Sequence, residues 1–199
     1  MKYLPVSVIG VTGVAQSGKS TLGELVAERC GFQHHNFADL MRDFLYAVNP
    51  IIEEPVICID YKTEEVETSI VRVRDVVDHI GWDKAKVEYL EVRQLMQRLG
   101  TEAGRNLLGE NFWVDQFFAT HLVNNLIITD VRFPNEAEAI KARGGIIVRI
   151  ERDGYEPVNG HISETAYTDQ DFTVNNNGTP DDLYNNFIAG LLNHAGDII

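Results

Sequence analysis

The chain has 199 residues, of which 44% are hydrophobic, and it carries a formal net charge of −13. A chain of this length and composition can build one α/β domain with a complete core. The negative charge disfavours the coating of nucleic acid, and no run approaches the ~18 apolar residues of a membrane span. Cys30 and Cys58 show no C-x-x-C spacing, which argues against a zinc site or a disulfide framework. We therefore expect a cytoplasmic protein that binds neither nucleic acid nor membranes.

The most informative stretch follows an apolar, strand-like segment at residues 6–11. Residues 13–20 (GVAQSGKS) fit the pattern G-x-x-x-x-G-K-[ST] at every fixed position. The glycines let the backbone point successive N–H groups at phosphate oxygens, and the following helix directs its positive dipole end at the anion. Lys19 is predicted to reach the β- and γ-phosphates of ATP, and the Ser20 hydroxyl to bind Mg²⁺. The predicted ATP-binding residues of this loop are Gly13, Ala15, Gln16, Ser17, Gly18, Lys19, Ser20 and Thr21.

Strand and helix patterns alternate along the rest of the chain. In chain order, the patterns predict a helix after the loop with an apolar stripe from Leu22 to Cys30, then a strand at 32–37, helices at 38–48, 69–80, 84–108 and 112–123, a strand at 126–130, a helix at 134–143, strands at 146–150 and 172–174, and a final helix capped at 179–182. Residues 51–66 fit no clear pattern, and residues 56–61 within them could be a strand or part of an inserted loop. This alternation predicts a mostly parallel sheet covered by helices on both faces.

Asp130 ends an apolar run that has the form of a buried parallel strand. A P-loop protein places the acid that holds Mg²⁺ at this position, often through water. The alternative is a helix-capping or turn aspartate, since Pro134 begins a helix nearby. In either case Asp130 lies at the sheet edge where open α/β folds bind ligands, and Arg132 could face the same crevice.

Several cationic and polar side chains are candidates for binding a second phosphate group. Arg93, Gln97 and Thr101 recur at four-residue intervals, with Arg98 and Arg105 expected one helical step to the side. Such a line is often a solvated helix face, but a protein that binds two nucleotides needs bidentate donors for phosphate. Further candidates of this kind are Arg42 on the second helix, Arg152 at the start of a polar segment that could form a lid, and Trp82 and Trp113, which could stack on a base or belong to the core.

Seven segments together resemble the deoxynucleoside monophosphate kinases of tailed bacteriophages. They cover nearly the whole chain in the same order: 13–20 (GVAQSGKS), 37–42 (FADLMR), 81–86 (GWDKAK), 93–105 (RQLMQRLGTEAGR), 130–136 (DVRFPNE), 161–164 (HISE) and 176–179 (NNGT). The resemblance implies transfer of the γ-phosphoryl group of ATP to a deoxynucleoside 5′-monophosphate (dNMP), in service of phage DNA synthesis in the host cytoplasm.

The resemblance also implies an architecture and residue roles. It implies a single P-loop kinase domain over residues 1–199 with a three-layer α/β/α fold, a core at 1–37 and 124–199, a helical acceptor-binding part at 38–123 and a lid at 152–171. Arg42, Arg93 and Arg105 would clamp the acceptor phosphate, in a site that also includes Asp39, Trp82, Gln97 and Thr101. Arg132 and Arg152 would neutralise the transferring group, and Asn176 and Gly178 would lie near the adenine.

Two other functions fit parts of the pattern. A kinase for an alcohol acceptor such as dephospho-coenzyme A shares the P-loop architecture and would need a basic carboxylate, for which Asp39 is a candidate. A non-catalytic nucleotide-dependent switch would hydrolyse ATP slowly without an acceptor. The oligomeric state is left open by the sequence, with a homodimer as one option.

Overall fold

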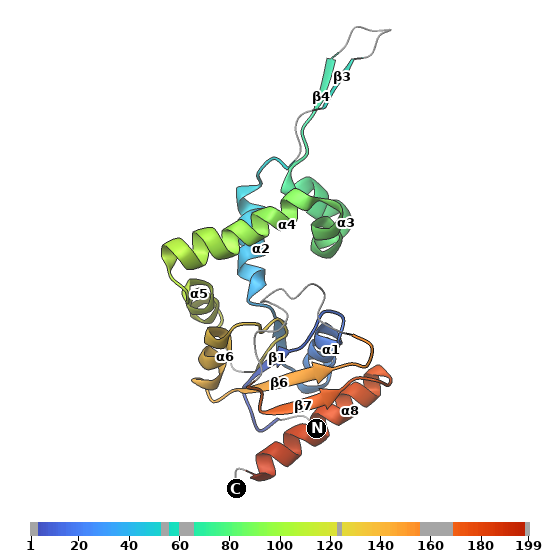
Figure 1. The fold of residues 1–199 in the computed structure, drawn as a ribbon, viewed down its shortest axis with the longest axis vertical. Helices are drawn as coiled ribbons and strands as arrows, with labels where there is room; N and C mark the ends of the chain where they lie inside the picture. The colour runs from blue at the N-terminus through green and yellow to red at the C-terminus, as the bar shows by residue number, and fades with distance from the viewer. Residues whose placement is uncertain (1–3, 53–55, 60–65, 123–124, 156–168, 198–199) are drawn as a thin grey trace. The chain divides into compact units, whose positions relative to one another are not determined.

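The computed structural model describes residues 4–52, 56–59, 66–122, 125–155 and 169–197. The chain folds into two compact units, shown in Figure 1. The first unit, which we call the sheet unit, consists of Met1–Ala38 and Val114–Ile199, and the second, the helical unit, is Asp39–Trp113.

The sheet unit contains a five-stranded sheet in which every pair of neighbouring strands is parallel. The strand order is β2 (Gln33–His35), β5 (Leu126–Ile128), β1 (Val8–Thr12), β6 (Ile146–Glu151) and β7 (Phe172–Asn175). All residues of β1 and β5 are buried, which explains why these strands are continuous apolar runs rather than alternating ones.

Helices cover both faces of this sheet. On one face α1 (Lys19–Cys30) and α8 (Pro180–Asp197) pack against Ile9 and Val11. On the other face α5 (Phe112–Thr120) and α6 (Pro134–Lys141) pack against Val8 and Ile128. The predicted three-layer α/β/α fold with a parallel sheet is therefore confirmed.

The helical unit has its own apolar core. It contains α2 (Ala38–Val48), α3 (Val73–Glu88), α4 (Leu90–Gln97) and the π-helix η1 (Arg98–Leu108), together with an antiparallel hairpin of β3 (Val56–Ile59) and β4 (Val66–Ser69). Its fully or nearly buried side chains are Leu45, Ile52, Val73, Val76, Ala85 and Val92. Strand β3 lies within the segment 51–66, where a strand from Val56 was one of two predicted alternatives.

The sequence predicts a helix at 84–108, in which Gly100 and Gly104 allow a break or close packing near Thr101, but the structure interrupts it earlier. Tyr89 has an extended backbone (φ −115°, ψ 100°) and separates α3 from α4, and from Arg98 onward the helix is a π-helix. The predicted helix at 69–80 begins at Val73, because residues before it form β4, and it continues past Gly81, whose φ of 77° kinks it. The remaining predicted elements are present with small shifts of their ends.

The helical unit is shorter at its end than the predicted range 38–123. Val114, Phe117 and Phe118 of α5 pack in the core of the sheet unit, so most of this helix belongs to that unit.

Among the described residues, no helix combines the length and apolar character needed to cross a membrane.

Candidate active site

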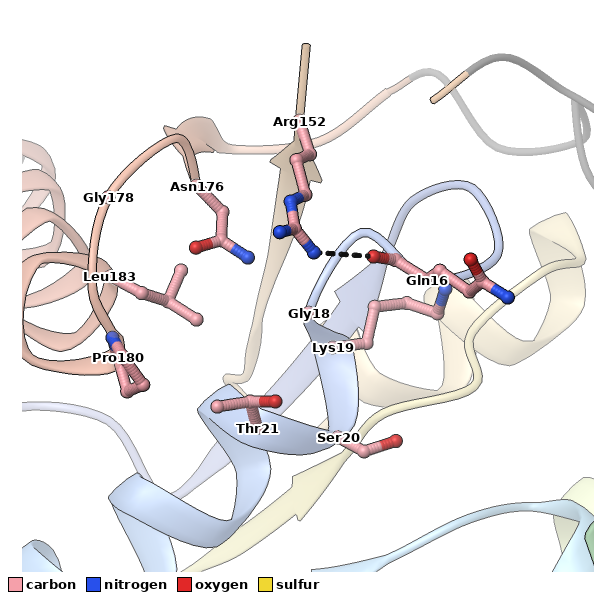
Figure 2. Close-up of a pocket in the computed structure, with 10 residues that line it drawn as sticks. All are labelled: Gln16, Gly18, Lys19, Ser20, Thr21, Arg152, Asn176, Gly178, Pro180 and Leu183. Carbon is pink, nitrogen blue, oxygen red and sulfur yellow. Dashed lines mark hydrogen bonds between the residues drawn. The ribbon is translucent and has the colours of Figure 1, made fainter. Parts of the chain in front are cut away.

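A cavity of about 340 Å³ lies beside the loop that follows β1. Figure 2 shows the residues that line it, which come from three separate parts of the chain: Gln16, Gly18, Lys19, Ser20 and Thr21 from the P-loop and α1, Arg152 after β6, and Asn176, Gly178, Pro180 and Leu183 around the start of α8. The structure thus gathers around one cavity many of the residues predicted to bind ATP, together with Arg152.

Glycine conformation shapes the loop around the start of α1. Gly13 and Gly18 have φ values of 142° and 107°, in the region that side chains with a Cβ rarely adopt. A Cβ on Gly13 would also lie 2.5 Å from the carbonyl oxygen of Ile150, so the loop can pass close to β6 only with glycine there. The first residue of α1 is Lys19, which brings the helix N-terminus to the cavity, where an anion is favoured.

The ammonium group of Lys19 is folded onto the loop. Its Nζ donates to the carbonyl oxygens of Gly13 at 2.9 Å and Val14 at 2.6 Å, and the side chain is half-buried. A phosphate group that entered the loop would compete with these two carbonyls for the ammonium. The loop, its lysine and the helix terminus fit a triphosphate by their donor chemistry.

Arg152 lies over the loop from the end of β6. One of its terminal guanidinium nitrogens donates to the carbonyl oxygen of Gln16 at 3.4 Å, as Figure 2 shows, and the guanidinium stacks on the Tyr155 ring at 4.7 Å from the ring centre. Its side chain is exposed, so it can turn toward a bound phosphate. The predicted lid at 152–171 falls largely on residues 156–168, which are outside the described residues.

Asn176 connects the loop after β7 to the P-loop. Its side-chain amide donates to the carbonyl oxygen of Ser17 at 2.7 Å, and its amide nitrogen occupies the space where a Cβ on Gly18 would lie. The structure thus gives Asn176 a contact with the P-loop itself, and its predicted contact with adenine stays a prediction.

The loop carrying Gly178 is fixed by Asp182. The carboxylate accepts hydrogen bonds from the Thr179 hydroxyl at 2.7 Å and the Thr179 backbone N–H at 2.9 Å. These hydrogen bonds lower the pKa of Asp182, and the hydrogen bond from the Thr179 hydroxyl has the larger effect. Pro180 and Leu183 also line the cavity, and we did not predict them, although they directly follow the motif at 176–179.

Asp130 caps a helix, which is one of the two roles that the sequence allowed. Its carboxylate oxygens accept the backbone N–H groups of Phe37 at 2.8 Å and Ala38 at 3.0 Å. The capped helix is α2 rather than the nearby α6, whose own N-terminus is held by the buried Glu136. Asp130 and Glu136 therefore both accept hydrogen bonds from backbone N–H groups at the start of a helix. The Arg132 side chain between them is exposed.

The predicted acceptor-site residues lie in the helical unit. Asp39 and Arg42 form an ion pair at 3.1 Å, and the Nε atom of Arg42 is buried without a hydrogen-bond partner among the described residues. Trp82 is half-buried and packs against the core of the unit. Along α4 and η1, the side chains of Arg93, Gln97 and Thr101 are exposed and Arg105 is half-buried.

Comparisons with known proteins point to one family. A family model described as deoxynucleotide monophosphate kinase matches residues 52–187, a range that begins after the P-loop. A putative deoxynucleotide monophosphate kinase of Acanthamoeba polyphaga mimivirus is 28% identical over 193 residues, which cover 92% of this chain and 94% of that protein. The deoxynucleotide monophosphate kinase of Escherichia phage RB69 is 30% identical over 101 residues, but these cover only 47% of this chain and 41% of the phage protein.

Among solved structures, shikimate kinase from Aquifex aeolicus aligns with a TM-score of 0.49 and 13% identity, covering 94% of this chain and 98% of that one. This likeness is too weak to add to the assignment. The family match extends over more than half of the residues and includes the segments at 93–105 and 130–136. The chain therefore belongs to the deoxynucleotide monophosphate kinase family.

Proposed function

We propose that this protein transfers the γ-phosphoryl group of ATP to deoxynucleoside 5′-monophosphates, producing ADP and the deoxynucleoside diphosphate. The observation that carries the proposal is the cavity that joins Lys19, Arg152 and Asn176 at the N-terminus of α1, in a chain of this family. An enzyme that transfers a phosphoryl group to a monophosphate needs such a site for ATP and a separate site for the acceptor.

The chemistry demands positioning and charge neutralisation rather than a strong base. The attacking group is a phosphate oxygen that is already an anion at neutral pH. Lys19 and Arg152 would stabilise charge on the transferring group, with Arg132 as a further donor. Arg42, Arg93 and Arg105 would hold the acceptor phosphate, assisted by Asp39, Trp82, Gln97 and Thr101.

Mg²⁺, when bound, would supply charge neutralisation for the terminal phosphates of ATP, and Ser20 and Asp130 are the residues that would hold it. Ser20 fits this ion because its hydroxyl lies at the cavity in the first turn of α1. Asp130 lies just after β5, at the carboxyl end of a strand next to β1, where a P-loop protein places the acid that holds Mg²⁺ through water, and this position supports that role for Asp130. Both ligand assignments are part of the proposal.

The test is ADP formation from Mg·ATP with purified protein and a panel of dNMPs, ribonucleoside monophosphates and dephospho-coenzyme A. We expect stimulation by one or more dNMPs, with matching deoxynucleoside diphosphate. Stimulation only by dephospho-coenzyme A would replace the acceptor class and leave the donor site intact. Acceptor-independent turnover would favour the nucleotide-dependent switch.

Replacing Arg93 with alanine should raise the KM for the dNMP at least tenfold and leave the KM for ATP within about twofold. The reason is that a charge-assisted, bidentate contact to the acceptor phosphate would be lost. Gln94→Ala is the control, since Gln94 is also exposed on α4 and belongs to neither the proposed acceptor site nor the proposed interface. Equal effects of Arg93→Ala on both KM values would contradict the acceptor role.

We also infer that two copies associate through the helical unit. Phe44, Val48 and Leu107 are 52%, 59% and 80% exposed and border one cavity of about 640 Å³. Exposed apolar surface of this kind marks an interaction site, and the Arg98–Glu102 pair at its edge would complement its own copy across a two-fold axis. Leu107→Glu should convert a dimer into a monomer in light scattering, whereas a native monomer would refute the inference.

The location and partners follow from the reaction. ATP and deoxynucleotides are cytoplasmic metabolites, so the proposed reaction takes place in the cytoplasm, that of a host cell if the chain is encoded by a phage. The net charge of −13 supports small nucleotides held at local cationic sites rather than a nucleic-acid partner.

A further inference from the structure

The sequence of α4 and η1 repeats every four residues. One set is polar (Arg93, Gln97, Thr101 and Arg105), and another is mostly apolar (Leu95, Leu99, Ala103 and Leu107). An α-helix has 3.6 residues per turn, so each four-residue step turns the side chain by about 40°. Three such steps would spread the polar set over about 120°, and a continuous α-helix could not keep either set on one face.

The change of helix type would keep both sets aligned in ideal helix geometry. Residues 90–97 are α-helical, and residues 98–108 form the π-helix, in which about 4.4 residues complete a turn and four-residue steps rotate in the opposite direction, by about −30°. The two rotations offset one another, so the polar set stays within a sector of about 50°. An independent observation supports this geometry: all four members of the apolar set line the cavity of the helical unit.

This alignment corrects the position expected for Arg105. In an α-helix Arg105 would be displaced to the side of Arg93, Gln97 and Thr101, and it would lie near Arg98. In the α/π arrangement Arg105 belongs to the polar row, whereas Arg98 lines the cavity bordered by the apolar set.

A tryptophan from the next helix packs into the π-helix. Trp113 is 7% exposed, and its indole N–H donates to the carbonyl oxygen of Gly100 at 3.1 Å. A Cβ on Gly104 would overlap the indole, and a Cβ on Gly100 would lie 2.9 Å from the sulfur of Met41. The indole therefore needs the glycine at 104, and its hydrogen bond is made to a carbonyl within the π-helix.

We propose that Trp113 is a positioning residue of the acceptor site. Its indole holds residues 98–108 in the π form and thereby keeps Thr101 and Arg105 in one row with Arg93 and Gln97, facing the same acceptor phosphate. This inference rests on the proposed function, because the row matters only if these side chains bind a dNMP. The π-helix is rare and is frequently found at functional sites, which is consistent with a segment kept in this form for its side-chain alignment.

The experiment compares Trp113→Phe, Gly104→Ala and the native protein by steady-state kinetics and thermal unfolding. Phenylalanine keeps an aromatic ring but removes the N–H donor, and alanine at 104 displaces the indole. We expect Trp113→Phe to raise the KM for the dNMP about tenfold, with the KM for ATP changed less than twofold at a temperature well below the unfolding transition. Gly196→Ala is the glycine control, because nothing lies within 4 Å of the added Cβ.

A double-mutant cycle separates positioning from general stability. If Trp113 acts through Arg105, the pair Trp113→Phe and Arg105→Ala should impair dNMP binding little more than Arg105→Ala alone, because coupled residues give non-additive effects. Additive effects, or equal changes in both KM values, would overturn the proposal even if Gly104→Ala failed to fold. The native protein is tested with dNMPs before any variant is compared. If no dNMP stimulates it, the proposed function fails, and this result is distinct from a failure of the positioning role.

Discussion

Lys19→Ala is expected to lower kcat about 10³-fold while the protein remains folded. The ammonium lies at the N-terminus of α1, where it donates to the carbonyl oxygens of Gly13 and Val14. Loss of one group that stabilises transition-state charge typically costs 10²–10³ in kcat, and a P-loop lysine contacts the transferring phosphates directly.

The same substitution should change stability little, because the two lost hydrogen bonds are each worth only about 1 kcal/mol. Circular dichroism and thermal unfolding check that the fold persists, and Lys84→Ala, at an exposed lysine of the helical unit, serves as the matched control with near-native kcat. Near-normal turnover of a folded Lys19→Ala protein would remove the P-loop from the mechanism.

Asp130→Ala should lower the free energy of unfolding by about 2–3 kcal/mol, because it leaves two backbone N–H groups at the start of α2 without their charged acceptor. For a chain of this size the unfolding temperature should fall by roughly 5–10 °C. Asp43→Asn, at an exposed position of the same helix, is the control and should leave the unfolding temperature nearly unchanged.

Asp130→Asn tests the proposed second role of the same carboxylate. The amide keeps one oxygen to accept an N–H group but has no charge for water on Mg²⁺. Below its unfolding temperature, this variant should need about tenfold more Mg²⁺ for half-maximal activity at fixed ATP. An unchanged Mg²⁺ requirement would leave Asp130 with the capping role alone.

Local patterns in the sequence were enough to predict the sheet and the nucleotide loop. Buried parallel strands such as Val8–Thr12 and Leu126–Ile128 are continuous apolar runs, and the P-loop has fixed glycines at fixed spacing. Both signals lie within a few neighbouring residues. For that reason they can be read without knowledge of the rest of the fold.

The two features that the sequence did not predict, the helix capped by Asp130 and the π-helix, depend on contacts between residues that are separated in the sequence. Asp130 caps a helix whose first N–H groups are about 90 positions away in the chain, so the sequence near Pro134 suggested the wrong helix. The π-helix at 98–108 contacts Trp113 through the Gly100 carbonyl. Without knowledge of that helix type, its four-residue repeat cannot be distinguished from a slowly rotating stripe on an α-helix. No local propensity distinguishes these cases.

The connection of Asn176 to Ser17, which lie 159 positions apart in the chain, has a consequence for the order of folding. The central strand β1 pairs with β5 and β6, whose residues follow it only after more than half of the sequence, and such distant pairing makes sheet formation slow. The contacts of the helical unit, by contrast, fall within one continuous stretch of chain. We therefore expect its amides to gain protection first in pulse-labelled hydrogen exchange. The nucleotide loop should take its final shape only after β7 has joined the sheet and Asn176 has reached Ser17. A nascent chain that ends before β7 should therefore be unable to hold ATP.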